Sequence, residues 1–179
     1  MDDFFADTDA WFDQAGFDDD FLWRGRVVNL MEDISEQVSI DNYASPILGT
    51  PHDLRDWDEN EYVEILWGQD TNDIIYGARE VNKLIGRAGG DVFVMSGNDS
   101  AEDFNVLEGD RIFCPDYDGE LFITEVYRGD DIESTIETSG GFWSGMSMTL
   151  YDTSGIDAYN SIIGDGDLRL VAENFEVPA

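Results

Sequence analysis

The sequence predicts a mainly β protein built around a short parallel roll of strands. Three consecutive nine-residue blocks, 68–76, 77–85 and 86–94, each begin with glycine. Their sixth positions are Asp73, Asn82 and Asp91, and each eighth position holds a large apolar residue. No segment after residue 40 has the apolar periodicity of a long helix. Repeats with this period and these residue types are typical of parallel β-helices whose turns bind calcium.

Each block is expected to form a six-residue turn followed by a three-residue strand. Glycine at the first position permits positive φ and a close approach between neighbouring backbones. The central strand residues, Ile75, Leu84 and Phe93, are expected to point into the core. Because two blocks complete one coil of 18 residues, the first and third blocks are expected to stack directly.

This stacking places Asp73 above Asp91, with carbonyl oxygens of the two turns between them. Calcium takes roughly six to eight oxygen ligands from carboxylates and carbonyls, so we expect one calcium site at this edge of the roll. The candidate ligands from the two turns are Asp73, Asp91, Gly68, Gln69, Asp70, Gly86, Arg87 and Ala88. Asn82, on the opposite edge, is a weaker candidate because the neighbouring blocks offer it only Glu64 and Ser100. The alternative is that Arg79, Lys83 and Arg87 neutralise the acidic turns without an ion.

The composition excludes several classes of partner. A formal net charge of −32, with Lys83 as the single lysine, excludes electrostatic binding to nucleic acid or anionic lipid and favours divalent cations. No apolar run approaches the length of a membrane span. The acidic N-terminal residues do not resemble the basic start of a secretory signal. Cys114, the single cysteine, excludes an internal disulfide.

An acidic, aromatic arm is expected over residues 1–23. Its aromatic residues are Phe4, Phe5, Trp11, Phe12, Phe17, Phe21 and Trp23. Two pairs are seven residues apart, so a short helix could present them on one face. In one interpretation these side chains bind a groove on a protein partner. In the other, the segment is a mobile acidic tail or folds back on its own domain.

The remaining chain is expected to flank the roll. Apolar residues at three-to-four spacing predict a helix over 26–40, expected to cap the open end of the roll. The expected divisions are 1–23 (arm), 24–58 (helical and irregular cap), 59–112 (roll) and 113–179 (C-terminal β region). Strands are expected at 61–67, 112–114, 121–127, 131–138, 142–151 and 164–171.

Three stretches, GQDTNDIIYG, GRAGGDVFV and AEDFNVLEGDRI, carry a resemblance to a known family. They resemble the opening, closing and following segments of repeats-in-toxin (RTX, haemolysin-type) calcium-binding proteins. The resemblance extends over roughly residues 60–163 and implies a parallel β-roll, calcium in the turns and export by a type I system. Gln69, Thr71 and Arg87 replace glycines of the repeat, and Asn82 replaces an aspartate.

No catalytic residue is expected, because the chain has no H-E-x-x-H, G-x-S-x-G or phosphate-loop motif. The sequence favours a non-enzymatic, calcium-binding structural or adhesive protein that acts outside the bacterial cytoplasm. One alternative is a subunit or decoration protein of a virion or surface layer that docks by its N-terminal arm. A second alternative is a fragment of an RTX-class secreted enzyme.

Overall fold

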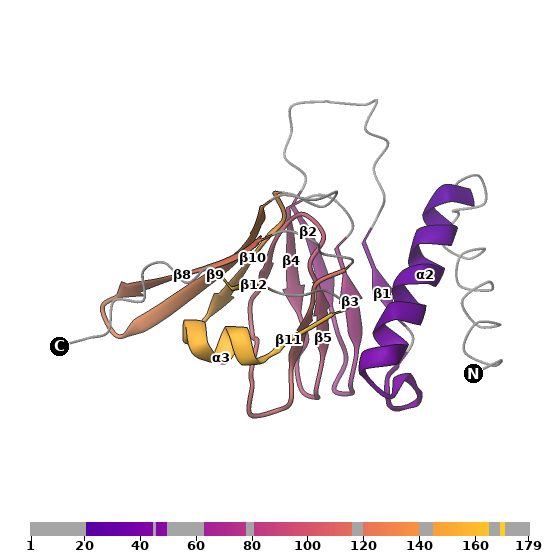
Figure 1. The fold of residues 1–179 in the computed structure, drawn as a ribbon. Helices are drawn as coiled ribbons and strands as arrows, with labels where there is room; N and C mark the ends of the chain where they lie inside the picture. Colours follow the sequence, from indigo (N-terminus) through magenta and orange to yellow (C-terminus); the bar gives the residue numbers. More distant parts are fainter. Residues whose placement is uncertain are drawn as a thin grey trace.

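The computed structural model describes residues 21–44, 46–49, 63–77, 81–115, 120–139, 145–164 and 169–170 of the 179-residue chain. Within these residues the protein is mainly β, with two sheets and short helices (Figure 1). The helices are α2 (Phe21–Gln37), the 3-10 turn η1 (Ile40–Asn42) and α3 (Gly155–Asn160).

Sheet A contains, in spatial order, β1 (Ile47–Leu48), β3 (Ile74–Tyr76), β5 (Val92–Val94), β7 (Arg111–Phe113) and β11 (Ile162–Ile163). Sheet B contains β12 (Arg169–Leu170), β8 (Glu120–Arg128), β9 (Asp131–Ser139), β10 (Ser147–Tyr151), β6 (Asn98–Ala101), β4 (Asn82–Ile85) and β2 (Glu64–Trp67).

From β1 to β7 the chain alternates between the two sheets, and each strand pairs in parallel with the strand two steps further along. Ile75 pairs with Phe93, and Leu66 pairs with Leu84, which is an offset of 18 residues in both sheets. The next coil departs from this period. Leu84 pairs with Ala101 and Phe93 pairs with Ile112, offsets of 17 and 19.

Sheet A is buried on both faces. One face joins sheet B around a core that includes Ile75, Leu84 and Phe93, as expected for the eighth position of each block. The other face is covered by α2, whose Leu30, Met31 and Ile34 pack with a second apolar cluster. Burial on both faces explains why β3 (IIY) and β5 (VFV) are continuously apolar, as is typical of parallel sheets.

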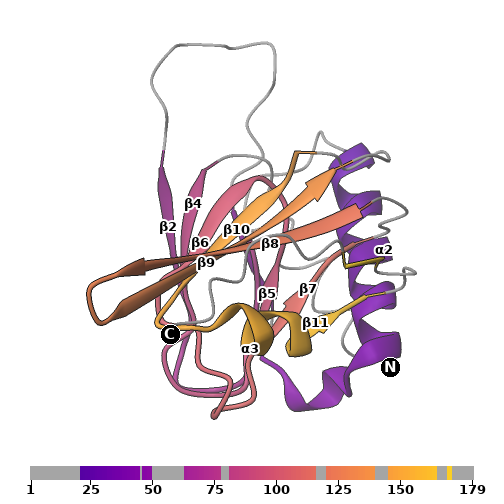
Figure 2. The ribbon, with the colours of Figure 1, turned by 60° about the vertical axis from the view of Figure 1, so that its left-hand side comes forward.

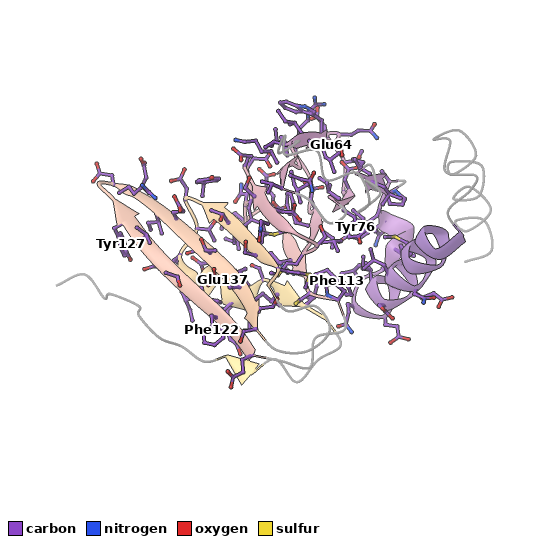
Figure 3. The ribbon with its side chains drawn as sticks, turned by 90° about the horizontal axis from the view of Figure 1, so that it is seen from above. Glu64, Tyr76, Phe113, Phe122, Tyr127 and Glu137 are labelled. Carbon is purple, nitrogen blue, oxygen red and sulfur yellow. The ribbon has the colours of Figure 1, made fainter. Side chains whose placement is uncertain are left out.

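The helix α2 therefore covers one face of sheet A. Tyr76 and Phe113 belong to the cluster with α2 and point toward this helix in Figure 3. The sequence-based expectation that the helix caps the open end of the roll is thus incorrect. The helix also begins at Phe21 and ends at Gln37, earlier than the expected 26–40. Phe21 and Trp23 are helical residues and not part of a separate arm, while residues 1–20 lie outside the described residues.

Sheet B has one solvent-facing side, and its strands alternate accordingly. In β2 and β4 the inward residues Leu66 and Leu84 are buried, whereas Ile65 and Lys83 are exposed. Beyond β6 the sheet becomes antiparallel, with β10 paired to β9 and β9 to β8. The β8–β9 hairpin extends away from the parallel strands (Figure 1).

The expected strands at 61–67, 112–114, 121–127, 131–138 and 142–151 correspond to β2, β7, β8, β9 and β10, each with shifted ends. The expected strand at 164–171 corresponds to β12, reduced to the two described residues Arg169 and Leu170. The strands β6 and β11 and the short helix α3 were not predicted. The expected division after residue 112 falls within β7, and sheet A continues across it. In the described part of the chain, no helix has the length and apolar character needed to cross a membrane.

Phe93→Ala is expected to lower the free energy of unfolding by about 3–5 kcal/mol, because it leaves a cavity between the sheets. The Phe93 ring is fully buried, and its centroid lies 5.8 Å from that of Phe104. Urea unfolding measures the loss. Leu107→Ala is the matched control, since Leu107 is 93% exposed and its truncation should change stability by less than about 0.5 kcal/mol. Equal losses for both variants would contradict the assigned core.

Candidate metal centre at the aspartate turns

Three stacked aspartates connect successive coils at the turns that precede sheet A. The backbone N–H of Asp73 donates to Oδ1 of Asp91 at 2.8 Å, and the N–H of Asp91 donates to Oδ1 of Asp110 at 2.8 Å. All three residues are buried. The structure thus brings Asp73 and Asp91 together, as the repeat predicts, and adds Asp110. We call these residues the aspartate ladder.

The second carboxylate oxygens of the ladder differ in their partners. Oδ2 of Asp73 accepts the N–H of Gln69 at 2.7 Å, and Oδ2 of Asp110 accepts the N–H of Asn105 at 2.8 Å. Oδ2 of Asp91 is buried and has no hydrogen-bond partner. A buried carboxylate oxygen without a donor is energetically costly, so this atom marks the place where a cation would be most favourable.

Arg87 explains why Asp91 lacks this partner. Arg87 occupies the position in its turn that Gln69 occupies in the first turn, but it has φ of +70°. Its N–H donates to Oδ2 of Asp103 at 2.8 Å, and the preceding Gly86 N–H donates to Oδ1 of Asp103 at 2.8 Å. Asp103 therefore binds the two amide groups at the start of this turn, and neither amide reaches Asp91.

Glycine is required where the carboxylates of Asp73 and Asp91 fold back over their own turns. A Cβ on Gly86 would collide with Oδ2 of Asp91, and a Cβ on Gly68 would lie 3.1 Å from Oδ2 of Asp73 and collide with the Gly86 carbonyl. The glycine at the first position and the aspartate at the sixth are thus one steric unit. This contact also brings the Gly86 carbonyl close to the Asp73 turn.

The ladder carries unfavourable electrostatics in the absence of a cation. The pKa of Asp91 is raised to about 7, mainly by burial and in smaller part by the nearby carboxylates of Asp110, Asp73 and Asp103, while the Asp73 N–H opposes the shift. Burial likewise raises the pKa of Asp110 to about 6, with Glu108 and Asp103 adding to the effect. A cation beside these carboxylates would favour their charged forms.

Lys83 and Arg87 are engaged elsewhere, whereas the Arg111 guanidinium donates to the backbone carbonyl of Asp110 at 2.9 Å. The Lys83 ammonium lies 3.2 Å from Oε1 of Glu102, and the Arg87 guanidinium lies 5.4 Å from the centroid of the Trp67 ring. Among the described residues no ion pair involves the aspartate ladder. Neutralisation of Asp73 and Asp91 by Lys83 or Arg87 is therefore not observed, and Arg79 lies outside the described residues.

On the opposite edge, Asn82 has a partner that the repeat did not predict. Its backbone N–H and its side-chain amide donate to Oδ1 of Asp99 at 3.1 and 3.0 Å, and the amide also donates to the Gly77 carbonyl. Oδ2 of Asp99 accepts from Ser96 Oγ and from the Gly97 N–H. The expectation that Asn82 faces only Glu64 or Ser100 is incorrect, and the Asn82–Asp99 pair is satisfied without a metal ion.

The other expected ligands have simpler roles. Gln69 contributes its N–H to Asp73, while Asp70 and Ala88 are exposed on the turn surfaces. Within the described residues, no group of three or more His, Cys, Asp or Glu side chains converges on a possible metal position. A calcium ion at Asp91 would therefore need backbone carbonyls in addition to carboxylates.

Comparisons with protein-family models, with curated proteins and with solved structures found no match.

The nine-residue pattern does not identify Asp99, Asp103 and Asp110 as site residues. Asp99 follows Asn82 by 17 residues, and Asp110 follows Asp91 by 19, so a strict nine-residue period skips both. An aspartate placed directly before a short apolar strand, as in Gly109–Asp110–Arg111–Ile112, is the signal that could have identified the third ladder residue.

In the presence of a chelator, stability is expected to fall as pH rises from about 4 to 7. The pKa of Asp91 in the folded protein is about 7, against 3.8 for a free side chain. The stabilising proton is therefore fully bound below pH 4 and is lost as pH rises through the folded pKa. One such group contributes a slope of at most about 1.4 kcal/mol per pH unit.

Urea unfolding at several pH values tests this expectation. Asp91→Asn should reduce the slope to the contribution of Asp110, whose pKa is about 6 in the folded protein, and should be more stable than the native chain at pH 7 in chelator. Asp70→Asn, at an exposed carboxylate of the preceding turn, is the control and should retain the native slope. An unchanged slope in Asp91→Asn would show that the buried carboxylate is not the titrating group.

Asn82→Asp is expected to destabilise the protein in chelator by about 1–3 kcal/mol, because it replaces a donor to Asp99 with a second buried carboxylate. Thermal unfolding at neutral pH measures this loss. Lowering the pH should reduce it, since a protonated side chain can donate again. Asn98→Asp, an exposed neighbour on the same edge, provides the control.

Proposed function

We propose that this chain is a non-enzymatic, calcium-stabilised structural module of the RTX type that acts outside the bacterial cytoplasm. The observation that carries the proposal is the unpartnered Oδ2 of Asp91, buried among the carboxylates of Asp73, Asp103 and Asp110. Carboxylate oxygens together with turn carbonyls are the ligands that calcium prefers.

The geometry of the coil supports an RTX-type β-roll. Strands β2 and β3 pair in parallel with β4 and β5 at an offset of 18 residues, which equals two nine-residue blocks. The turns of the first and third blocks, with Gly68–Asp73 and Gly86–Asp91 at equivalent places, meet at one edge. In this proposal Asp73 and Asp91 supply side-chain oxygens, and the Gly68 and Gly86 turns supply carbonyls.

Repulsion between the stacked carboxylates is the reason that calcium would stabilise the folded chain. Two unit charges about 4 Å apart repel by about 4 kcal/mol at an effective dielectric constant near 20, and the whole chain carries a formal charge of −32. A divalent ion between stacked carboxylates converts this repulsion into attraction. A ligand that binds only the folded state stabilises it by about 2.7 kcal/mol at 100 times its Kd. A calcium-rich exterior would therefore favour the folded module.

The proposal makes no use of a catalytic residue. An assembly subunit remains the second candidate, and the specific observation that favours it is a set of exposed apolar side chains on β2 and immediately before β2 and β4.

Calcium is expected to raise the melting temperature of the native chain by several degrees and to leave Asp91→Asn nearly unchanged. At neutral pH, the more stable of the two proteins should therefore differ between chelator and calcium. Asp91→Asn is the more stable in chelator, where its carboxylate no longer adds repulsion, and the native chain is the more stable in calcium. Differential scanning calorimetry with calcium and with chelator measures both values.

Asp70→Asn is again the control and should retain the calcium response. Magnesium at the same concentration tests for simple screening of charge, because it prefers a smaller octahedral site. An equal response to both ions, or a melting temperature of the native chain that does not respond to calcium, would refute the calcium centre.

A further inference from the structure

The outward face of β2 and β4 carries an exposed apolar and basic surface. Val63, Ile65, Trp67 and Val81 are 46%, 48%, 55% and 40% exposed. Lys83 lies in register with Ile65 on the neighbouring strand, and the Arg87 guanidinium stacks on the Trp67 ring at 5.4 Å. We call these six residues the β2–β4 patch.

The patch follows from the alternation of side chains along the two strands. Leu66 and Leu84 point into the core, so their neighbours Ile65 and Lys83 point to solvent. The structure gives no described element that covers these outward residues. β2 is also the last strand of sheet B, and no described strand pairs with its outer edge. Contiguous exposed apolar side chains at the edge of a sheet are typical of an interaction site.

The charge of the patch is unusual for this molecule. The whole chain has nine basic residues against 41 acidic ones, yet two of the nine, Lys83 and Arg87, border these apolar side chains. Lys83 forms an ion pair with Glu102. The Arg87 guanidinium lies on an aromatic ring, where it can still attract a carboxylate. A ligand that complements the patch is therefore both aromatic and acidic.

Residues 1–20 have this composition. They contain eight aspartates, no lysine or arginine, and the aromatic residues Phe4, Phe5, Trp11, Phe12 and Phe17. We propose that the β2–β4 patch binds residues 1–20 of a second copy of this chain. Aromatic rings of the arm pack on Ile65 and Trp67, and its aspartates lie near Lys83 and Arg87.

The position of α2 favours a second copy over the arm of the same chain. Residues 1–20 join the sequence at Phe21, the start of a helix that covers the outer face of sheet A. The patch belongs to sheet B, and α2 and β2 lie on opposite sides of the molecule in Figure 2. Sheet A, the core and sheet B therefore lie between α2 and the outward face of β2, and packed sheets are about 10 Å apart.

The spacing of the arm's aromatic residues leads to the same choice. Phe4 and Trp11, and Phe5 and Phe12, are seven residues apart and would share one face of a helix. Twenty residues in a helix span only about 30 Å. Such an arm extends to a neighbouring molecule more readily than it passes around its own sheet edge.

Because the arm and the patch are different surfaces, the contact is head-to-tail, and repeated copies form a ring or an open filament. The contact goes beyond the proposed calcium centre and does not depend on it, since the apolar part of the patch lies on the outward face of the strands and of the patch residues only Arg87 belongs to the Asp91 turn. Copies with a charge of −32 repel one another, so association should strengthen in salt of about 1 M, where the Debye length is only about 3 Å.

Complementation between two variants of the full-length chain tests the proposal. The patch variant is Ile65→Glu, which removes an apolar contact with the aromatic rings of the arm, puts a carboxylate in its place and keeps the Trp67–Arg87 contact. The arm variant carries Trp11→Ser and Phe12→Ser. Tyr151→Ser is the matched control, because Tyr151 is also exposed on the outward face of sheet B but lies outside the patch. Light scattering over a concentration series in high salt measures the mean mass.

The native chain and Tyr151→Ser should gain mass with concentration, while the patch and arm variants should each remain monomeric. An equimolar mixture of these two variants should form a 1:1 dimer and nothing larger, since one intact arm meets one intact patch. Trp67→Ser serves as a second patch variant, and thermal unfolding verifies that each variant is folded.

Three results would overturn the proposal: a native chain that stays monomeric, a mixture that does not associate, or a control that loses association. The series is repeated with calcium and with chelator. Association that persists while the melting temperature ignores calcium would refute the calcium centre alone. A calcium response without association would refute the arm–patch contact alone.

Discussion

The hydrogen bond from a backbone N–H to an aspartate carboxylate of the next coil is the contact on which the parallel part of this protein depends. It links Asp73 to Asp91 and Asp91 to Asp110 on one edge, and Asn82 to Asp99 on the other. On the ladder edge it lies immediately before the first residue of a strand, where the chain leaves a turn, whereas Asn82 is the first residue of β4 and Asp99 is the second residue of β6. The carboxylate therefore fixes the height of one turn above the next and with it the register of the strands.

This contact tolerates a change in coil length, and the repeat does not. The sequence separation is 18 residues from Asp73 to Asp91, 19 from Asp91 to Asp110 and 17 from Asn82 to Asp99. The turns absorb the added or missing residue, and on the ladder edge the acceptor keeps its place before the strand. A coil can thus continue beyond residue 94, where the nine-residue pattern of glycines has ended.

The same contact is the source of the molecule's electrostatic cost. An aspartate that serves as an acceptor inside a stack must lie close to the aspartates above and below it, and burial removes the water that would otherwise screen them. The amide donors offset this cost at Asp73 and Asp110. At Asp91, the positive φ of Arg87 and the two amides bound by Asp103 leave one oxygen unserved. On the opposite edge Asn82 is neutral and donates to Asp99, and both carboxylate oxygens of Asp99 have donors, although burial still raises the pKa of Asp99.

The two sheets divide the remaining tasks according to their burial. Sheet A lies between α2 and the core, so its strands carry apolar residues on both faces and present little to solvent. Sheet B covers the core with one face only, and its other face determines what the molecule can contact. The exposed apolar side chains at its β2 edge lie on this outward face.

The sequence by itself determined the parts of this protein that depend on local chemistry. Glycine at the first position and aspartate at the sixth predicted the turns, Ile75, Leu84 and Phe93 predicted the core positions, and the apolar pattern predicted most of the strands. These features repeat at a fixed spacing, so they are visible without coordinates. The pairing of Asp73 with Asp91 follows from the same spacing, because two blocks equal one coil.

Only the tertiary structure decided what depends on contacts between distant residues. The placement of α2 on sheet A could not be predicted because an amphipathic helix fits a sheet face and an open end equally well. The roles of Asp99, Asp103 and Asp110 depend on coils of 17 and 19 residues, which a fixed period does not register. The unpartnered oxygen of Asp91 depends on the direction of a single backbone N–H at Arg87. That direction is set by Asp103, 16 residues further along the chain, so it cannot be predicted from the local residue types.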